Sequence, residues 1–582
     1  MAARFGRWGL CCVLALGCEG TEALDGEVAP AWVPELACPS ADEAACLPGP
    51  ATTLAAGAAT RSVVPACWES WIDANDDQYY DAGDESFLDC GCDRLCPGDP
   101  GYVAPDEGES DGVFQAVWLA GFGNGRPANG VRDSALGMIG DGDGLFASVL
   151  VLEQDATRVA IATVDAVGIM YDQALEIRAA VAARGLDIDH VIVHSSHTHS
   201  GPDTMGIFGP SISRTGFQQR YADQIATAVA DAAAEAVAGL VPVELRTGEV
   251  DLNAVGGDKG VGNVIRDSRD PNIVDPRVGV AQFVHDGATV ATLVHWANHP
   301  ETIADDNLLM TSDFVHGVRK VVSEGSRWPD ASGRPGVGGV TLYLNGTVGG
   351  MMTSLGAEVT DPTGAVWREA SWEKVDAVGQ IVGEAALAAI DGATPASAPR
   401  LTIGAHELDL PVENTGYQAM FLIGVLSHRT ADGYDVNQPL GDDNLPYAPT
   451  EVDLLELGPI RLLTMPGEVL PESFLGGYDG AYTPPGQEIV DLSQPNAPEL
   501  ALAPAPPYLV DRLGGDLRWC VSLGNDEVGY VIPPYNFVLA DAGAYVLEAE
   551  GDHYEETNSL GAQTLPLLEA AADRLIAWLD AR

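Results

Sequence analysis

Basic residues are scarce in this chain of 582 residues. It contains 29 lysines and arginines against 85 aspartates and glutamates, and the only lysines are Lys259, Lys320 and Lys374. A nucleic-acid partner is excluded, because phosphate binding requires lysine and arginine gathered on one face and the net charge here is −56. The acidic residues are spread along the chain, which indicates a strongly hydrated surface that attracts divalent cations.

Long hydrophobic runs are also missing. Beyond the N-terminus no stretch is long and apolar enough for a membrane-spanning helix. The first residues combine Arg4 and Arg7 with a short apolar run over 8–16, which is the layout of a secretory signal. This run ends at Leu16-Gly17-Cys18, similar to the lipobox of bacterial lipoproteins, whose cysteine carries lipid. We therefore predict a signal peptide over 1–18 and an exported protein, either secreted or held at a membrane surface of the cell envelope by lipid on Cys18.

Cysteine is sparse except near the N-terminus. Residues 19–66 are rich in alanine and proline without periodicity, which predicts a tether, and 67–112 form a small cysteine-rich acidic segment. In an oxidising compartment an even number of cysteines favours disulfides, here up to three of open connectivity. The six cysteines concerned are Cys38, Cys46, Cys67, Cys90, Cys92 and Cys96. Cys520 is left over in an apolar segment, and we expect a buried free thiol there.

An acidic stretch in the cysteine-rich segment approaches the spacing of a calcium-binding loop. Gln78 stands where such loops usually have glycine, and the last position is an aspartate instead of glutamate. A weak Ca²⁺ site and a solvated acidic loop are therefore both open. The oxygen-bearing residues are Asp73, Asn75, Asp77, Asp81 and Asp84.

From residue 113 onward the pattern alternates strands with helices. Two β-branched runs flank Asp286-Gly287, a dipeptide typical of hairpin turns. Residues 218–240 repeat apolar side chains at intervals of three and four, which predicts an amphipathic helix. We predict an α/β fold of layered mixed sheets with flanking helices and a metal site at the strand ends. The expected strands are 148–152, 158–164, 190–195, 278–284 and 288–296, with others ending near Asn345, Pro466 and Leu523, and further helices are expected at 173–183, 313–323 and 560–579.

Three histidines, His194, His197 and His199, close the β-branched run that starts at Val191. On an extended backbone His197 and His199 point the same way, because side chains alternate along a strand. Ser200-Gly201-Pro202 then turns the chain. Histidines at a strand end can bind metal or move protons, although they can also simply cap the strand.

Three other polar residues follow predicted strands. His299 closes VHWANHPET, Glu468 follows IRLLTMPGE, and Tyr530 lies in NDEVGYVIPPY. A zinc site needs about four nitrogen, oxygen or sulfur donors. Taken singly, each residue has a structural interpretation: a hydrogen-bonded turn histidine, an acid at a helix N-terminus and a core tyrosine.

These segments, taken together and in order, resemble the neutral ceramidases. The shared pieces are HTHSGP, the segment VHWANHPETIADDNLLMTSDFVHG, the PGE that ends at Glu468, a late GY and a YE pair at Tyr554-Glu555. The resemblance spans most of 113–582 and identifies it as a catalytic domain. It implies one Zn²⁺ bound by His197, His299, Glu468 and Tyr530.

The same resemblance implies roles beside the metal. His199 would polarise the scissile carbonyl or handle a proton, and Tyr554 would touch substrate. Arg266 is the best match for an arginine that contacts substrate, with Arg269 and Arg277 nearby. One departure stands out: where ceramidases carry Gly-Asp-x-Ser-Pro with a serine at the reaction centre, this chain reads Gly349-Gly350-Met351-Met352, followed by Thr353 and Ser354.

Two functions follow from these expectations. The first is an exported zinc-dependent hydrolase of an N-acyl amide, either ceramide or a related N-acyl lipid. The second is a non-catalytic envelope lipoprotein of the same fold that binds zinc or calcium. The glycine-rich segment 120–130 lacks the spacing of a dinucleotide fingerprint, so we expect a glycine turn and no nucleotide cofactor there.

Overall fold

The computed structural model describes residues 36–37, 53–132, 144–255, 257–305, 307–350, 352–435, 437–441, 443–551 and 553–581. The predicted signal peptide, Cys18, Cys38 and Cys46 lie outside these residues. No helix in the described part of the chain is long and apolar enough to cross a membrane.

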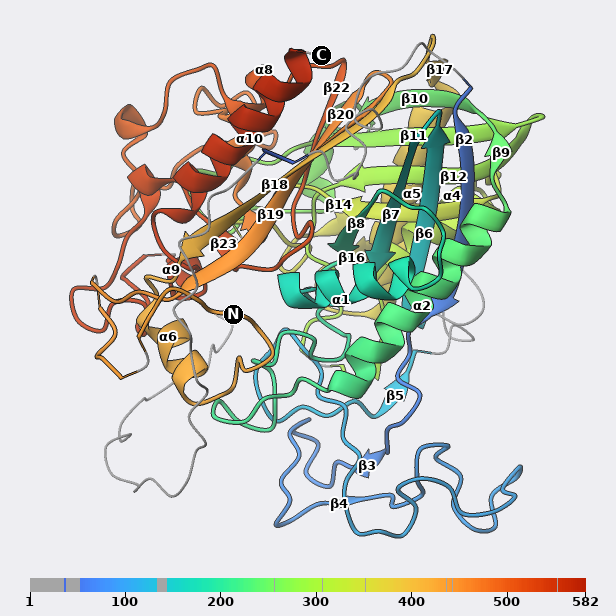
Figure 1. Ribbon diagram of the computed structural model, residues 1–582, viewed down its shortest axis with the longest axis vertical. Coiled ribbons are helices and arrows are strands. Elements are labelled where there is room, and N and C mark those ends of the chain that lie inside the picture. The colour runs from blue at the N-terminus through green and yellow to red at the C-terminus, as the bar shows by residue number, and fades with distance from the viewer. Residues whose placement is uncertain are drawn as a thin grey trace.

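Three mixed sheets of five strands form the centre of the molecule (Figure 1). The first runs in the order β9 (Val241–Pro242), β2 (Ala55–Ser62), β6 (Phe146–Gln154), β7 (Thr157–Val164) and β8 (His190–Ser195). The second runs β17 (Thr394–Pro395), β10 (Glu244–Asp251), β11 (Arg277–His285), β12 (Ala288–Trp296) and β14 (Val340–Asn345). The third runs β1 (Leu36–Ala37), β18 (Leu401–Pro411), β19 (Tyr447–Leu457), β20 (Ile460–Thr464) and β22 (Leu517–Val521).

The three sheets share one pairing plan. Each has an antiparallel hairpin, formed by β6–β7, β11–β12 or β19–β20, whose second strand pairs in parallel with β8, β14 or β22. Parallel neighbours end at the same edge of a sheet, so each sheet presents two loops at one edge. The Asp286-Gly287 turn has φ of 48° and 82°, the left-handed conformations that a two-residue hairpin loop requires, and this confirms the predicted hairpin.

The inner faces of the sheets pack on one another, and helices cover the outer faces. A shared core includes Ile161 of the first sheet, Phe283 of the second and Trp519 of the third. The prediction of layered mixed sheets with flanking helices is therefore confirmed. The flanking helices are α1 (Tyr171–Ala182) and α2 (Gln219–Ala238), α4 (Phe314–Glu324) and α5 (Trp372–Asp391), and α8 (Leu509–Leu513) and α10 (Thr564–Asp580), on the first, second and third sheet respectively (Figure 1).

Shorter elements carry the loops between these layers. The short helices are α3 (Leu252–Val255), α6 (Thr415–Leu422), α7 (Pro471–Leu475), α9 (Tyr554–Thr557) and the 3₁₀ turns η3 (Gly257–Asn263), η4 (Leu500–Leu502) and η5 (Pro534–Asn536). The short strands are β3 (Trp71–Ile72), β4 (Ser86–Phe87), β5 (Gly130–Val131), β13 (Leu309–Met310), β15 (Val359–Thr360), β16 (Val366–Trp367), β21 (Glu468–Val469) and β23 (Tyr530–Val531).

The predicted tether is wrong in part, because residues 55–62 form strand β2 inside the first sheet. Its sequence, AAGAATRS, carries almost no hydrophobic signal. Small side chains are needed there because α2 packs closely on the strand. A Cβ on Gly57 would lie 2.1 Å from the carbonyl oxygen of Ala236 in that helix.

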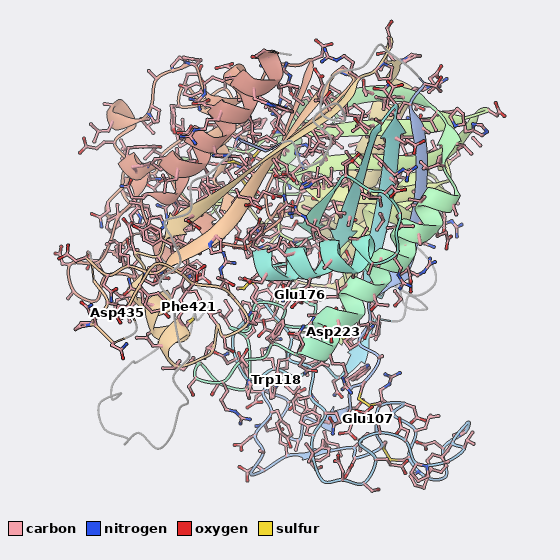
Figure 2. The ribbon with its side chains drawn as sticks, viewed as in Figure 1. Glu107, Trp118, Glu176, Asp223, Phe421 and Asp435 are labelled. Atoms are coloured by element: carbon pink, nitrogen blue, oxygen red, sulfur yellow. A yellow bond between two sulfur atoms is a disulfide. The ribbon has the colours of Figure 1, made fainter. Side chains whose placement is uncertain are left out.

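The cysteine-rich segment lies at the bottom of Figures 1 and 2, where the disulfides show as yellow bonds near Glu107. Disulfides join Cys67 to Cys92 and Cys90 to Cys96, and Cys520 is a buried free thiol. Two of the predicted pairs are thus present, and the expectation for Cys520 is confirmed.

The predicted calcium loop has its carboxylates turned to its own backbone. Asp73 accepts hydrogen bonds from the amides of Asp77 and Gln78, and Gln78 has φ of 66°. Among the described residues, no three carboxylates of this loop lie within metal-ligand reach of one another. This arrangement favours the solvated-loop interpretation.

The disulfide pattern predicts the outcome of peptide mapping on non-reduced, denatured protein. We expect peptides linked through Cys67–Cys92 and Cys90–Cys96, with Cys520 alkylated as a free thiol, because small acidic segments of this kind lack an apolar core and rely on crosslinks. Quantitative alkylation of Cys67 or Cys90 would contradict this pairing.

Candidate metal and active site

The histidine motif lies just beyond the end of β8. The strand ends at Ser195, and His197 adopts φ of 69°, in the left-handed region. The expectation that both imidazoles point one way along an extended backbone is therefore wrong in its geometry. The chain turns at His197 instead, and the turn still brings the two rings together, with 3.4 Å between Nε2 of His197 and Nε2 of His199.

The ring of His197 is fixed from behind. Its Nδ1 bonds the carbonyl oxygen of Val167, in the loop after β7, which leaves Nε2 facing the other histidines. His299 follows β12 and is held in the same way, because its Nδ1 lies 2.8 Å from the carbonyl oxygen of Met352. The side chains of His197, His199 and His299 offer nitrogens that all lie within 4.8 Å of one another.

A carboxylate from the segment that follows β20 of the third sheet completes this group. Glu468 begins β21 and is 7% exposed, and its Oε2 lies 2.9 Å from Nε2 of His299 and 3.5 Å from Nε2 of His197. Burial lowers the pKa of His197, but the Glu468 carboxylate more than offsets this and raises it. Burial likewise raises the pKa of Glu468, and the adjacent His197 and His299 lower it strongly overall.

Tyr530 reaches the same point through strand pairing. It begins β23, which pairs in parallel with β21 so that Tyr530 lies opposite Glu468. Its side chain is buried and hydrogen-bonded to Glu468, and burial together with that carboxylate raises the pKa of the phenol. The structure therefore brings together all four residues predicted as zinc ligands, from loops of all three sheets.

His199 has a carboxylate partner that the sequence analysis missed. Its Nδ1 lies 3.2 Å from Oε2 of Glu301, which is 3% exposed and stands two residues after His299. Burial lowers the pKa of His199 more than Glu301 raises it. The acid in the HPET segment was the available signal for this contact.

A glycine of the predicted turn lies directly against His199. Gly121 has φ of 103°, and a Cβ added there would lie 2.6 Å from Cβ and Cγ of His199. The ring of Phe122 meets the imidazole edge to face at 5.4 Å. The glycine turn predicted for 120–130 is present, and its residues Gly121 and Phe122 pack against His199.

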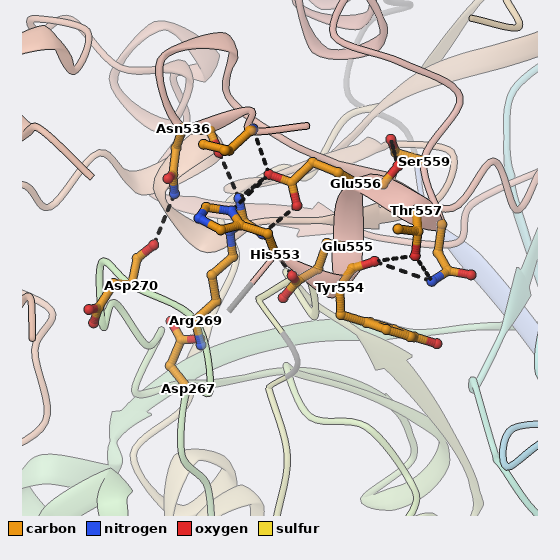
Figure 3. A network of polar contacts seen from close by, with 12 residues as sticks. Asp267, Arg269, Asp270, Asn536, His553, Tyr554, Glu555, Glu556, Thr557 and Ser559 are labelled. Atoms are coloured by element: carbon orange, nitrogen blue, oxygen red, sulfur yellow. Dashed lines mark hydrogen bonds and ion pairs between the residues drawn. The ribbon is translucent and has the colours of Figure 1, made fainter. Parts of the chain in front are cut away.

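Tyr554 and its following acids form a separate anchored unit (Figure 3). Arg269 is 2% exposed and donates to Glu555 at 2.7 Å and to Glu556 at 2.8 and 2.9 Å. These ion pairs fix α9, whose first residue is Tyr554. Tyr554 is 42% exposed, and its ring meets the Tyr530 ring at 6.2 Å between centroids. Tyr554 therefore lies at the rim of the cluster of predicted metal ligands.

Arg266 lies on the His299 side of this cluster. Its backbone pairs with Thr353, which also bridges to His299. The exposed guanidinium donates to Ser268 at 3.3 Å and packs beside Gly356, and no contact with a histidine is shown. Its substrate-binding role remains a prediction.

Comparison with known structures gives the fold a precedent. The chain matches the crystal structure of neutral ceramidase from Pseudomonas aeruginosa with a TM-score of 0.53 and 12% sequence identity, over 90% of this chain and 75% of that one. A structure described as ceramidase complexed with C2 matches with a TM-score of 0.54 and 12% identity, over 91% of this chain and 76% of the other. No family model and no curated protein matches the sequence. The chain has the neutral ceramidase fold.

Within the ceramidase fold, the two glycines of the departing segment have no room for a side chain. A Cβ on Gly349 would lie 2.5 Å from the backbone nitrogen of Leu470, and one on Gly350, where φ is 74°, would lie 2.8 Å from Oδ1 of Asp267. Met352 is fully buried in the core of the second sheet, so it offers no surface beside the predicted metal ligands. Met351 lies outside the described residues.

The residues just beyond this segment are engaged elsewhere. The Ser354 hydroxyl donates to the carbonyl oxygen of Val264 and accepts from Asn298. The Thr353 side chain contacts Glu301, the partner of His199. The Thr353 hydroxyl is thus connected to the histidine cluster through Glu301.

His194, the first histidine of the motif, is structural. It is fully buried, and its Nε2 accepts a hydrogen bond from the backbone amide of Asn345 at the end of β14. Burial lowers the pKa of His194 to about 3, which keeps the ring neutral as an acceptor requires. It ties the first sheet to the second.

A second buried group, His190, Glu451 and Asp453, also has the composition of a metal site. Arg178 donates to both oxygens of Glu451, and Nε2 of His190 lies 2.9 Å from Asp453. Burial lowers the pKa of His190, but Asp453 raises it to about 9, so the ring is protonated at neutral pH. Arg178 and His190 thus occupy the oxygens of Glu451 and Asp453, and this group is an ion-pair network.

The two groups therefore predict different responses to the same substitution. We expect metal analysis to find about one divalent ion per chain, lost in His299→Gln and retained in the matched variant His190→Gln, because Arg178 already occupies both Glu451 oxygens of the second group. Retention of metal by His299→Gln would place the site elsewhere.

Proposed function

We propose that this protein is an exported zinc-dependent hydrolase of the amide bond in ceramide or a related N-acyl lipid. The observation that carries the proposal is the meeting of His197, His299, Glu468 and Tyr530 at the loop edges of three sheets. Metal sites between layered elements are formed in this way by side chains that are remote in sequence. The ceramidase fold agrees with the proposal.

The donor set fits zinc. Imidazole nitrogen and carboxylate oxygen bind Zn²⁺ at about 2.0–2.2 Å, which places neighbouring donors of a tetrahedron about 3.3 Å apart. The observed separations of 2.9 and 3.5 Å from Glu468 to the two histidines bracket this value. When bound, zinc supplies Lewis-acid chemistry that polarises a carbonyl and lowers the pKa of water.

The chain itself supplies the proton-handling group. The Glu301 carboxylate lies 3.2 Å from Nδ1 of His199, and Nε2 of His199 faces His197 in the cluster. From that position His199 acts on the carbonyl or passes a proton to the leaving amine. Tyr554 at the rim, and Arg266 beyond it, would then contact the substrate.

The other function stays open on one observation. The position of the ceramidase serine is taken by Met352, which is buried in the core of the second sheet, so a non-catalytic zinc- or calcium-binding envelope lipoprotein of this fold is the second candidate. Turnover of any N-acyl amide by the purified protein separates the two. Export is supported in either case by the disulfides, which are typical of oxidising compartments.

Substitutions at the two motif histidines should have different effects. We expect His197→Gln to lose both zinc and turnover, whereas His199→Gln keeps zinc and loses about a hundredfold or more in kcat, because a ligand sets affinity and a positioned acid or base sets rate. Equal zinc loss in both variants would make His199 a ligand in place of Tyr530.

The glycine turn gives a matched pair that tests the same role without touching a histidine. Gly121→Ala forces a methyl group into His199 and should reduce kcat/KM about a hundredfold. Gly125→Ala has comparable backbone strain, with φ of 85°, but meets only the Tyr79 ring at 3.7 Å and the Pro210 carbonyl at 3.9 Å. Its kcat/KM should stay near wild type, and equal losses in the two variants would contradict the seating of His199.

The departing glycine segment predicts substrate preference. We expect ceramide to be a poorer substrate than a simple N-acyl amide of equal chain length, because losing a hydroxyl that binds the substrate typically costs about 3–4 kcal/mol in the transition state. The measurement is kcat/KM for both substrates under one condition. A tenfold or greater advantage for ceramide would show that another group replaces the serine.

A further inference from the structure

The glycine turn that packs against His199 belongs to a small hairpin over 118–128, which we call the turn hairpin. Backbone hydrogen bonds join its two arms. Gly121 and Phe122 are the residues of this hairpin that contact His199. The position of the turn hairpin therefore determines how closely the imidazole of His199 is held.

The cysteine-rich segment is bonded to successive residues of the turn hairpin. Trp71 is only 3% exposed, and its Nε1 donates to the carbonyl oxygen of Pro127 at 3.0 Å. Oε1 of Gln78 accepts a hydrogen bond from Arg126 at 3.2 Å. A backbone bond of 2.8 Å joins the amide two residues after Gln78 to the carbonyl just before Arg126. Residues 125–127 of the hairpin are thus all tied to this segment.

Arg126 also connects the turn hairpin to the other neighbour of His199. It is 2% exposed, and its Nη2 donates to the carbonyl oxygens of Asp305 and Asn307 as well. Both lie in the loop between β12 and β13 that contains Glu301, whose carboxylate lies 3.2 Å from Nδ1 of His199. Arg126 therefore joins the cysteine-rich segment, the turn hairpin and the Glu301 loop at one point.

The cysteine-rich segment is itself restrained. Its two disulfides limit the conformations that the chain can adopt. The Trp71 ring packs edge to face on Tyr80 at 5.6 Å between centroids, and the Tyr80 ring packs on Phe114 at 4.7 Å. The residues that bond the turn hairpin therefore have neighbours of their own that hold them in place.

We propose that the cysteine-rich segment is a clamp that positions His199, with Trp71 and Gln78 as its positioning residues. Both act through the turn hairpin. The inference rests on the proposed function, in which His199 acts on the carbonyl or passes a proton. A displacement of about 1 Å in a reacting group can cost about a hundredfold in rate, so ordinary hydrogen bonds remote from the substrate can control turnover.

The first test compares two tryptophan substitutions in the full-length, zinc-loaded protein. Trp71→Phe removes the bond to Pro127 but keeps an aromatic ring, and it should reduce kcat about fivefold with KM and zinc content unchanged. Trp68→Phe is the matched control. Trp68 is also 3% exposed and lies in the same segment, but its Nε1 has no hydrogen-bond partner among the described residues. Its kcat should stay near wild type, and equal losses in the two variants would overturn the proposal.

The second test changes the acceptor for Arg126. Gln78→Leu removes it and should lower kcat about as much as Trp71→Phe, whereas Gln78→Glu keeps an acceptor oxygen and should leave kcat near wild type. We express kcat per bound zinc, so that a smaller folded fraction does not count as a loss. A Gln78→Glu enzyme as slow as Gln78→Leu would contradict the clamp.

The third test asks whether the clamp acts through His199. Trp71→Phe and Gln78→Leu combined should lower kcat about tenfold or more, but should have no further effect in a His199→Gln background, because the positioned group is then already absent. The same fold-loss in both backgrounds would indicate general structural support and overturn the proposal.

Hydrogen exchange separates this inference from the proposed function. If wild type hydrolyses no N-acyl amide, the proposed function fails, and amide exchange followed by mass spectrometry decides the clamp alone. The amides of Ala120 and His199 are bonded to the carbonyls of Gly201 and Pro300. Peptides that contain them should exchange faster in the combined variant than in wild type or Trp68→Phe. Unchanged exchange in these peptides overturns the clamp.

Discussion

The buried contact of Glu468 with His299 and His197 is the interaction on which the site depends. A carboxylate taken out of water costs several kcal/mol unless charged or hydrogen-bonded partners surround it. Here the partners follow strands of the first and second sheets, while the carboxylate lies in the segment that follows β20 of the third. The three sheets can reach this arrangement only when they are packed together, so the chemistry of the site and the packing of the core are one constraint.

A seam of polar backbone contacts holds the three sheets in that arrangement. Asn345, at the end of β14, donates through its backbone to His194 in β8 and through its side chain to the carbonyl oxygen of Ser196, just after β8. Asn525, in the loop after β22, exchanges two hydrogen bonds with Val193 of β8. Strands β8, β14 and β22 hold equivalent positions, since each pairs in parallel with the second strand of the hairpin in its sheet. The contacts near the ends of these three strands therefore lie close together at the site.

The strands and helices were largely predictable from periodicity, since β8 at His190–Ser195 and α2 at Gln219–Ala238 have strong hydrophobic patterns. Strand β2 was not predictable, because it needs small side chains where α2 packs on it. Alanine and glycine give no hydrophobic periodicity. The four expected metal ligands were found by their order along the chain. Their meeting point was invisible to spacing, because their separations in sequence match no local metal motif.

Residues that act through others left the weakest signals. Gly121 and Glu301 both contact His199, one by leaving room through the lack of a side chain and the other by placing a carboxylate 3.2 Å from Nδ1. The local sequence does not show that a glycine packs against a catalytic side chain or that a glutamate is buried, because both depend on which residues the fold places beside them.

The sequence by itself determined the charge, the class of fold, the hairpin at Asp286-Gly287 and the residue types available at the strand ends. These follow from composition and short-range periodicity, which act within a few residues. Only the tertiary structure decided which of the histidines face one another. His194 bonds a strand of the neighbouring sheet, and His190 lies in an ion-pair network. The histidines that lie together are His197, His199 and His299. Which histidines meet depends on the long-range packing of three sheets, and local sequence patterns carry no information about that packing.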